Sequence, residues 1–176
     1  KTLWGIETLN EPRWDIPDEI LCDFNKRAYW AIRKHCSYEH CAVVFHDGFR
    51  GDRILDVFGA LMRPPEYQNV ILDAHRYQCF DDYHKSLDHK GNIADAEGPL
   101  ARELNKIQHT YWTIVGEWSL GCNGPRTMAE HQAFYDAQKK VFAENVLGSF
   151  FWSYKIENSS RVDWSLRDAV EQGLVL

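Results

Sequence analysis

The sequence predicts an α/β fold in which five parallel strands alternate with helices. Short apolar runs recur along the chain, and segments with apolar residues at three- and four-residue steps separate them. Strands separated by helices pair in parallel through right-handed crossovers. The chain has 176 residues, 44% of them hydrophobic, which is enough for one globular core of ordinary size.

The first strand is expected in the short apolar run that leads to Asn10 and Glu11, and Pro12 forces the chain out of it. A carboxyl group at the mouth of a buried strand can be desolvated enough to hold a proton near neutral pH, as a general acid must. Glu11 is therefore the candidate proton donor.

The next segments read as a helix and two strands. Residues 16–36 show helical spacing, with Pro17 suited to the first turn. Residues 41–46 form a continuous apolar run, typical of a strand covered on both faces, and end at His46 and Asp47. The sequence allows either a role in the site or a structural role for these two residues.

A shorter helix is expected over residues 52–61, followed by a strand over 69–75 that ends in His75 and Tyr77. Residues 81–95 are polar and are predicted to form a long loop. A helix is predicted over residues 96–109.

The last third of the chain contains two more strands. One covers residues 111–117 and ends in a second acid, Glu117, and the other covers 146–152 and ends in Trp152. Thr127 and Glu130 have capping-box spacing and should open a helix that runs to about residue 145. Asp163 is expected to cap a final helix, which Gly173 stops.

A doubly wound sheet and a (β/α)8 barrel both fit this alternation. The polar and aromatic residues lie at the carboxyl ends of the strands, where barrel active sites are found, and no glycine-rich phosphate loop follows any strand. We therefore predict a partial (β/α)8 TIM barrel over residues 1–176. A barrel uses roughly 31 residues for each strand and helix, so a chain of 176 residues is too short for the whole ring.

The composition limits the classes of partner that this chain is expected to bind. The net charge is −6 and no run of Lys or Arg occurs, which argues against nucleic acid and anionic membranes. The five cysteines show no Cys-x-x-Cys spacing, and neither a metal nor a cofactor is predicted. Six histidines lack three-ligand zinc spacing and are expected at the surface or in the core: His35, His40, His84, His89, His109 and His131. The sequence allows both disulfides and free thiols for the five cysteines. Asn158 begins a glycosylation sequon, which has meaning only in a secreted protein.

Four motifs, taken together, resemble glycoside hydrolase family 5, and most closely its exo-β-1,3-glucanase branch. They are, in chain order, residues 5–12, residues 75–80, residues 115–119 and residues 151–158, with Trp164 further on. Each motif alone is common, but four in this order at these spacings are specific. They correspond to the fourth through eighth strands of that family, so the resemblance implies that the N-terminal strands are absent from this chain.

The resemblance implies roles for particular residues. It implies that Glu11 is the acid/base and Glu117 the nucleophile of a retaining β-glycosidase, without a cofactor. It further implies that Asn10 holds the sugar 2-hydroxyl, and that His75 and Tyr77 surround the nucleophile. Phe80 and Trp152 would be stacking platforms, and the substrate would be β-1,3-glucan or a related β-glucoside.

Several alternatives stayed open. Linkage could instead be that of an endo-β-1,4-glucanase or a β-mannanase, and the chain could be a catalytically silent, carbohydrate-binding half-barrel. The unpaired edges of five strands would invite another polypeptide that supplies the missing barrel strands. The expected location is secreted or cell-wall associated. Retention itself requires the two carboxyl groups at about 5 to 5.5 Å.

Overall fold

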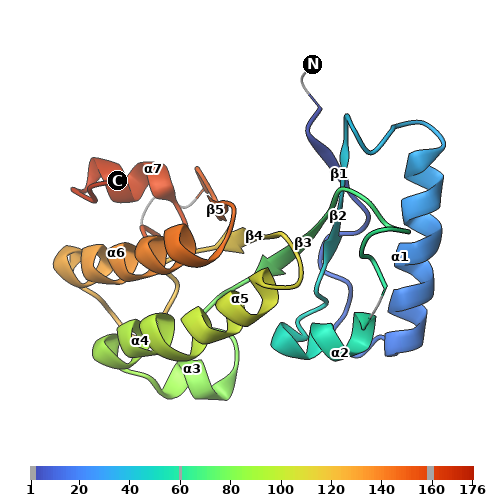
Figure 1. Ribbon diagram of the computed structural model, residues 1–176. Coiled ribbons are helices and arrows are strands. Elements are labelled where there is room, and N and C mark those ends of the chain that lie inside the picture. The colour runs from blue at the N-terminus through green and yellow to red at the C-terminus, as the bar shows by residue number, and fades with distance from the viewer. Residues whose placement is uncertain (1–2, 60, 158–160) are drawn as a thin grey trace. The chain divides into compact units, whose positions relative to one another are not determined.

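The computed structural model describes residues 3–59, 61–157 and 161–176 (Figure 1). The glycosylation sequon at Asn158 lies outside these residues. The chain divides into two compact units, and each is described here by itself. The first unit contains Lys1–Ala74 and Lys106–Ile114, and the second contains His75–Asn105 and Val115–Leu176.

The five predicted parallel strands are confirmed, and they are hydrogen-bonded in chain order, β1-β2-β3-β4-β5. This sequential order and the intervening helices make the fold part of a (β/α)8 barrel. The strands are shorter than the apolar runs that predicted them, by one to four residues each. Their bounds are β1 Gly5–Glu7, β2 Ala42–His46, β3 Val70–His75, β4 Thr113–Trp118 and β5 Ser149–Phe151.

The first unit is built around β2, whose five residues are all buried. Helix α1 (Asp18–Arg33) packs against this strand, and a 3-10 turn, η1 (Gly51–Arg53), leads into α2 (Ile54–Phe58). The ring of Phe45 lies 4.9 Å from that of Phe58 and 5.9 Å from that of Tyr111, measured between centroids. These edge-on aromatic contacts fix α2 over the sheet.

The second unit has its core between β4, β5 and α6 (Met128–Asn145). The indole of Trp118 is 2% exposed and contacts the rings of Tyr135, Phe142 and Phe151 at 5.1 to 5.5 Å. Trp118 immediately follows Glu117, so burial of this ring fixes the strand end that carries the acid. Helix α6 begins with the predicted capping box, in which Thr127 and Glu130 bond each other's backbone N–H groups.

The prediction of a loop over residues 81–95 is wrong. This stretch forms α3 (Asp82–Ser86) and α4 (His89–Asp95), which continues through a π-helical turn, η2 (Ala96–Leu100), into α5 (Ala101–Gln108). Asp81 and Asp88 cap the two short helices, because their carboxylates accept from the N–H groups of His84 and Gly91. These Asp residues carried the missed signal: an acid three positions before the amide that it caps.

The final helix, α7 (Leu166–Glu171), also begins differently from the prediction. Ser165, not Asp163, is its N-cap, and its hydroxyl accepts from the N–H of Asp168. Gly173 follows the helix with a φ of 110°, as a terminating glycine does.

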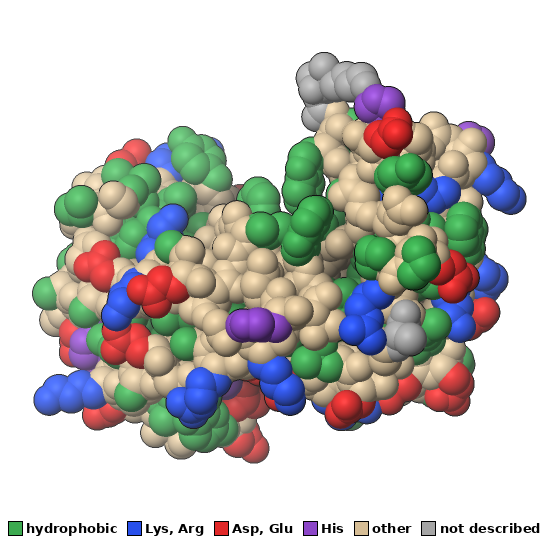
Figure 2. Space-filling view, in the orientation of Figure 1, with side chains coloured by type: hydrophobic (Ala, Val, Ile, Leu, Met, Phe, Trp, Pro, Cys, Tyr) green, Lys and Arg blue, Asp and Glu red, His purple; other side chains and the backbone are tan. Residues whose placement is uncertain are grey.

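Three general features complete the description. All five cysteines are free thiols. Among the residues that the structure describes, no helix is both long and apolar enough to cross a membrane. On the face shown in Figure 2, acidic and basic side chains are interspersed rather than gathered into a patch of one sign.

Candidate active site

Glu117 lies in a prepared polar setting at the carboxyl end of β4. Its side chain is 13% exposed. The Tyr77 hydroxyl donates to Glu117 Oε2 at 2.6 Å, and His75 Nδ1 lies 3.4 Å from the same oxygen. A hydrogen bond to a carboxylate is stronger than one between neutral groups.

The alternation of an extended chain explains why these groups meet. His75 ends β3, and Tyr77 lies two residues further on, so both side chains point the same way. Arg76, between them, points away and pairs with Glu103 at 2.7 Å. The Arg76 N–H donates to the Glu117 carbonyl at 2.9 Å, which extends the strand pairing to the acid itself.

Both neighbours approach the same oxygen of Glu117. Oε2 is held by Tyr77 and approached by His75, which leaves Oε1 as the oxygen that can attack an electrophile. The carboxylate is thus held in one orientation, a requirement for nucleophilic catalysis.

An aromatic cluster surrounds Tyr77. Its ring lies 5.4 Å from that of Phe80 and 5.3 Å from that of Trp164, between centroids. Phe80 is 63% exposed, and Trp152, just after β5, is 52% exposed. Both rings are therefore accessible to a ligand. The sequence gives Trp164 no role in the site, because nothing in its local pattern places it beside Tyr77.

The segment after β3 is also fixed from its other side, by the buried carboxylate of Asp95. This carboxylate accepts from Gln78 Nε2 at 2.7 Å and from the Tyr83 hydroxyl at 3.1 Å, and it contacts His84 Nε2 at 3.2 Å. The hydrogen bond to Asp95, assisted by a second one to Asp81, raises the pKa of His84. The sequence had assigned His84 to the surface or core.

Asn10 and Glu11 lie in the first unit, beyond the end of β1, and both are exposed. Glu11 has a φ of 44°, in the left-handed region that a residue with a Cβ rarely adopts. The sequence predicted a buried strand that delivers a desolvated acid. Instead, β1 is only partly buried, because it has three residues and pairs along one edge with β2. The pairing of Glu11 with Glu117 stays a prediction.

His46 and Asp47, at the end of β2, are buried and serve the turn that follows. His46 Nδ1 accepts from the Gly48 N–H at 2.8 Å, and the Asp47 carboxylate accepts from the Phe49 N–H at 2.9 Å. Of the two roles that the sequence left open, these contacts support the structural one.

The same turn is tied to the start of α1. Arg50 Nε and Arg53 donate to the Asp18 carboxylate, each at 2.7 Å. The bonds from Arg53 and then Arg50 lower the pKa of Asp18 to about 2. The loop after β2 is therefore held by charge-assisted bonds to a helix of the same unit.

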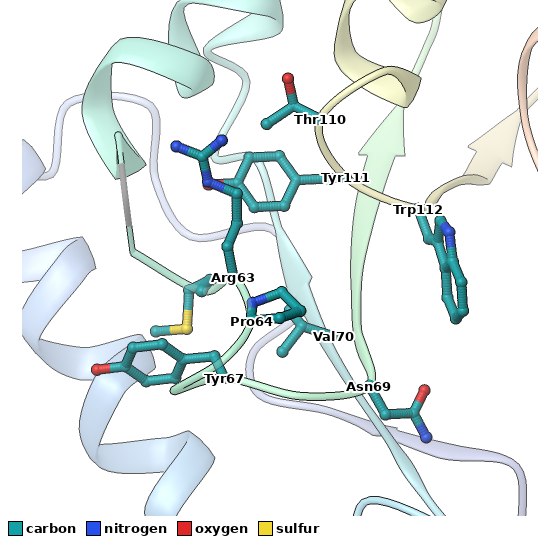
Figure 3. A pocket seen from close by; sticks show the side chains of 9 residues that line it. Arg63, Pro64, Tyr67, Asn69, Val70, Thr110, Tyr111 and Trp112 are labelled. Carbon is teal, nitrogen blue, oxygen red and sulfur yellow. The ribbon is translucent and has the colours of Figure 1, made fainter.

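A separate cavity of about 280 Å³ lies in the first unit at the amino ends of β3 and β4 (Figure 3). Tyr67, Tyr111 and Trp112 line it, together with Arg63, whose guanidinium lies 5.9 Å from the Tyr111 ring centroid. Ligand chemistry in parallel α/β folds occurs at the opposite ends of the strands. We therefore assign the candidate site to the carboxyl ends.

Comparison with known proteins defines the class. The family model described as cellulase (glycosyl hydrolase family 5) matches residues 1–158. The chain therefore belongs to glycosyl hydrolase family 5, as the sequence motifs indicated.

Particular relatives refine this likeness. A glucan 1,3-beta-glucosidase of Candida oleophila is 33% identical over 97% of this chain and 48% of its own length. One of Yarrowia lipolytica is 25% identical over 97% of this chain and 47% of its own length. The chain thus spans about half the length of these curated relatives. A family 5 enzyme of Prevotella bryantii has the same fold, with a TM-score of 0.64 and 18% identity over 95% of this chain and 55% of its own.

Proposed function

We propose that this chain carries the two catalytic acids of a retaining β-glycosidase that hydrolyses β-1,3-glucan or a related β-glucoside. The observation that carries the proposal is the setting of Glu117, whose Oε2 accepts from Tyr77 and lies beside His75. Family membership and the names of the relatives, glucan 1,3-beta-glucosidases, support the same reaction.

The mechanism has two displacements. In the first, Glu117 Oε1 attacks the anomeric carbon, the bond from that carbon to the leaving oxygen breaks, and Glu11 gives its proton to that oxygen. In the second, the Glu11 carboxylate takes a proton from water while the water oxygen attacks the same carbon. The ester bond to Glu117 breaks as this new bond forms, and both acids return to their starting state.

Substrate binding is assigned to residues that flank these acids. Asn10 would hold the 2-hydroxyl of the sugar, and Phe80 and Trp152 would stack on its apolar C–H faces. Their exposures of 63% and 52% support this role, since buried rings could not meet a sugar.

We propose that the chain supplies the fourth through eighth strands of the barrel. A polysaccharide substrate also suggests a secreted or cell-wall-associated protein.

The test uses the chain together with whatever polypeptide completes the barrel. Wild type, Glu117→Ala and Glu11→Ala are assayed on laminarin, a β-1,4-glucan, a β-mannan and aryl β-glucosides. Azide is then added to each alanine variant. Azide that replaces the Glu117 carboxylate should give an α-glycosyl azide, because it attacks from the face opposite the leaving group. Azide that replaces water after Glu11 is removed should give the β-glycosyl azide.

The outcomes separate the candidates. Product from laminarin, with these two azide products, supports the proposal. Preference for the β-1,4-glucan or the mannan would replace the proposed substrate, and binding without product would make the chain a carbohydrate-binding half-barrel. Exchange of the two azide products would reverse the roles of the two acids.

A further inference from the structure

Trp164 contacts the segments that follow β3, β4 and β5 in the second unit. Gly121 lies four residues after Glu117, and a Cβ built on it would be 2.7 Å from Trp164 Cζ2 and 3.0 Å from Cε2. No real Cβ tolerates 2.7 Å from a rigid ring carbon. Only glycine therefore lets the Trp164 ring lie this close to the backbone of the β4 loop.

The backbone around Trp164 is fixed to the same loops. The Ser153 N–H donates to the Trp164 carbonyl at 3.0 Å, which ties it to the segment after β5. The Leu120 N–H donates to the Asp163 carbonyl at 3.0 Å, which ties it to the segment after β4. The backbone that carries the indole is therefore fixed independently of the ring contacts.

The indole meets the residue that orients Glu117. The Trp164 ring is 5.3 Å from the Tyr77 ring with an interplanar angle of 33°, and 5.9 Å from the Phe80 ring. The Tyr77 hydroxyl in turn donates to Glu117 Oε2 at 2.6 Å. A shift of the ring by a fraction of an ångström would lengthen this bond, because the phenol oxygen lies at the far end of the ring.

We propose that Trp164, seated on Gly121, is a positioning residue that holds the Tyr77 phenol in line with the Glu117 carboxylate. The inference rests on the proposed function, in which Glu117 is the nucleophile, and it adds two residues outside the set that the sequence assigned to the site. Trp164 acts through Tyr77 and needs no contact with substrate.

The glycine offers a matched test. Gly121→Ala should push the indole away, whereas Gly148→Ala is the control: a Cβ at Gly148 meets nothing within 4 Å, and its φ lies outside the left-handed region. Gly121→Ala should lower kcat with little change in KM, and Gly148→Ala should leave both unchanged. Equal effects of the two substitutions would overturn the proposal.

A double-mutant cycle tests whether Trp164 acts through Tyr77. Loss of the hydrogen bond in Tyr77→Phe should lower kcat by ~10- to 100-fold, and Trp164→Ala should lower it by about 10-fold. In the Tyr77→Phe background, Trp164→Ala should cost less than about 2-fold more, since the bond that it supports is already gone. Additive losses would show that Trp164 acts elsewhere. Trp164→Phe, which keeps a ring, should recover part of the activity and guards against misfolding of the alanine variant.

A readout without activity separates this inference from the proposed function. Tyrosine rings are labelled for NMR, and the Tyr77 signal is assigned by its loss in Tyr77→Phe. In Trp164→Ala and Gly121→Ala this signal should shift and its ring should flip faster, and in Trp112→Ala it should not. If wild type releases no product yet the ring responds, the function is wrong and the contact is right. An active enzyme whose Tyr77 signal is unchanged in Trp164→Ala would overturn the positioning role.

Discussion

The two strand ends that carry the candidate acids are built differently. In the second unit, Glu117 ends a buried strand, accepts a bond from Tyr77, and is followed by the buried ring of Trp118. In the first unit, Glu11 lies on an exposed turn after a three-residue strand, with a left-handed φ of 44°. A nucleophile benefits from a fixed ionised carboxylate, whereas an acid/base must pass between two protonation states. The rigid setting belongs to Glu117, the residue proposed as the nucleophile.

The largest effect is expected from neutralising Glu117, the acid in the rigid setting. Glu117→Gln keeps the shape and an acceptor for Tyr77 but removes the nucleophile, so kcat should fall by ~10⁴-fold or more on every substrate. Thermal unfolding should change little. The control is Glu103→Gln, which neutralises an acid of the same unit that pairs with Arg76. An active Glu117→Gln variant would remove the basis of the proposed function.

Removal of Glu11 should lower activity less than neutralising Glu117 does. The loss should depend on the leaving group of the substrate. Glu11→Ala is expected to lower hydrolysis of glucan by ~10²- to 10⁴-fold. Aryl glucosides with activated leaving groups should lose much less, because their departing oxygen needs little protonation. The measurement is the ratio of kcat/KM for the two substrates in wild type and variant. An equal loss on both would argue that Glu11 is not the acid.

The positive φ of Glu11 predicts that glycine is more stable than alanine at this position, which is the reverse of their order inside a helix. Glu11→Gly should be more stable to urea than Glu11→Ala by about 1 kcal/mol, because glycine adopts a positive φ without strain. At Arg27, exposed within α1, the order should reverse, with alanine more stable than glycine by about 1 kcal/mol. The same order at both positions would show that Glu11 is unstrained.

The smallest effects should appear in the pH dependence of stability, with opposite signs in the two units. The folded pKa of Asp18 is lowered to about 2, so its contribution is present above about pH 4 and is lost as the pH falls toward 2. The folded pKa of His84 is raised by its bond to Asp95. Its contribution is therefore present below about pH 6.5 and is lost as the pH rises through the folded value.

Urea midpoints measured from pH 2 to 9 check this contrast. Asp18→Asn should flatten the acid side alone, and His84→Gln should flatten the side above pH 6 alone. A wild-type-like slope in either variant would contradict the corresponding assignment.

The sequence predicted the strands and their parallel order because apolar runs and helical spacing are properties of neighbouring residues. It also predicted Tyr77 and Glu117 as partners, but only through the family resemblance. It failed where a short polar helix depends on one capping side chain, as at Asp81 and Asp88, since polar residues near Gly and His are equally typical of loops.

Long-range packing could not be predicted from the sequence, for a different reason. Trp164 meets Gly121 and Tyr77 only after the loops of three strands are folded, and no spacing along the chain encodes that contact. Likewise, the exposure of Glu11 depends on how much of β1 is covered, which a run of apolar letters does not specify.

The placement of two neighbours on one oxygen of Glu117 also bears on the second half of the proposed reaction. If Oε1 forms the bond to the sugar, Oε2 becomes the carbonyl oxygen of the resulting ester. Tyr77 would then donate to that carbonyl and draw electron density from the ester, making the carboxylate a better leaving group when water arrives. A single phenol would thus assist both formation and breakdown of the covalent intermediate.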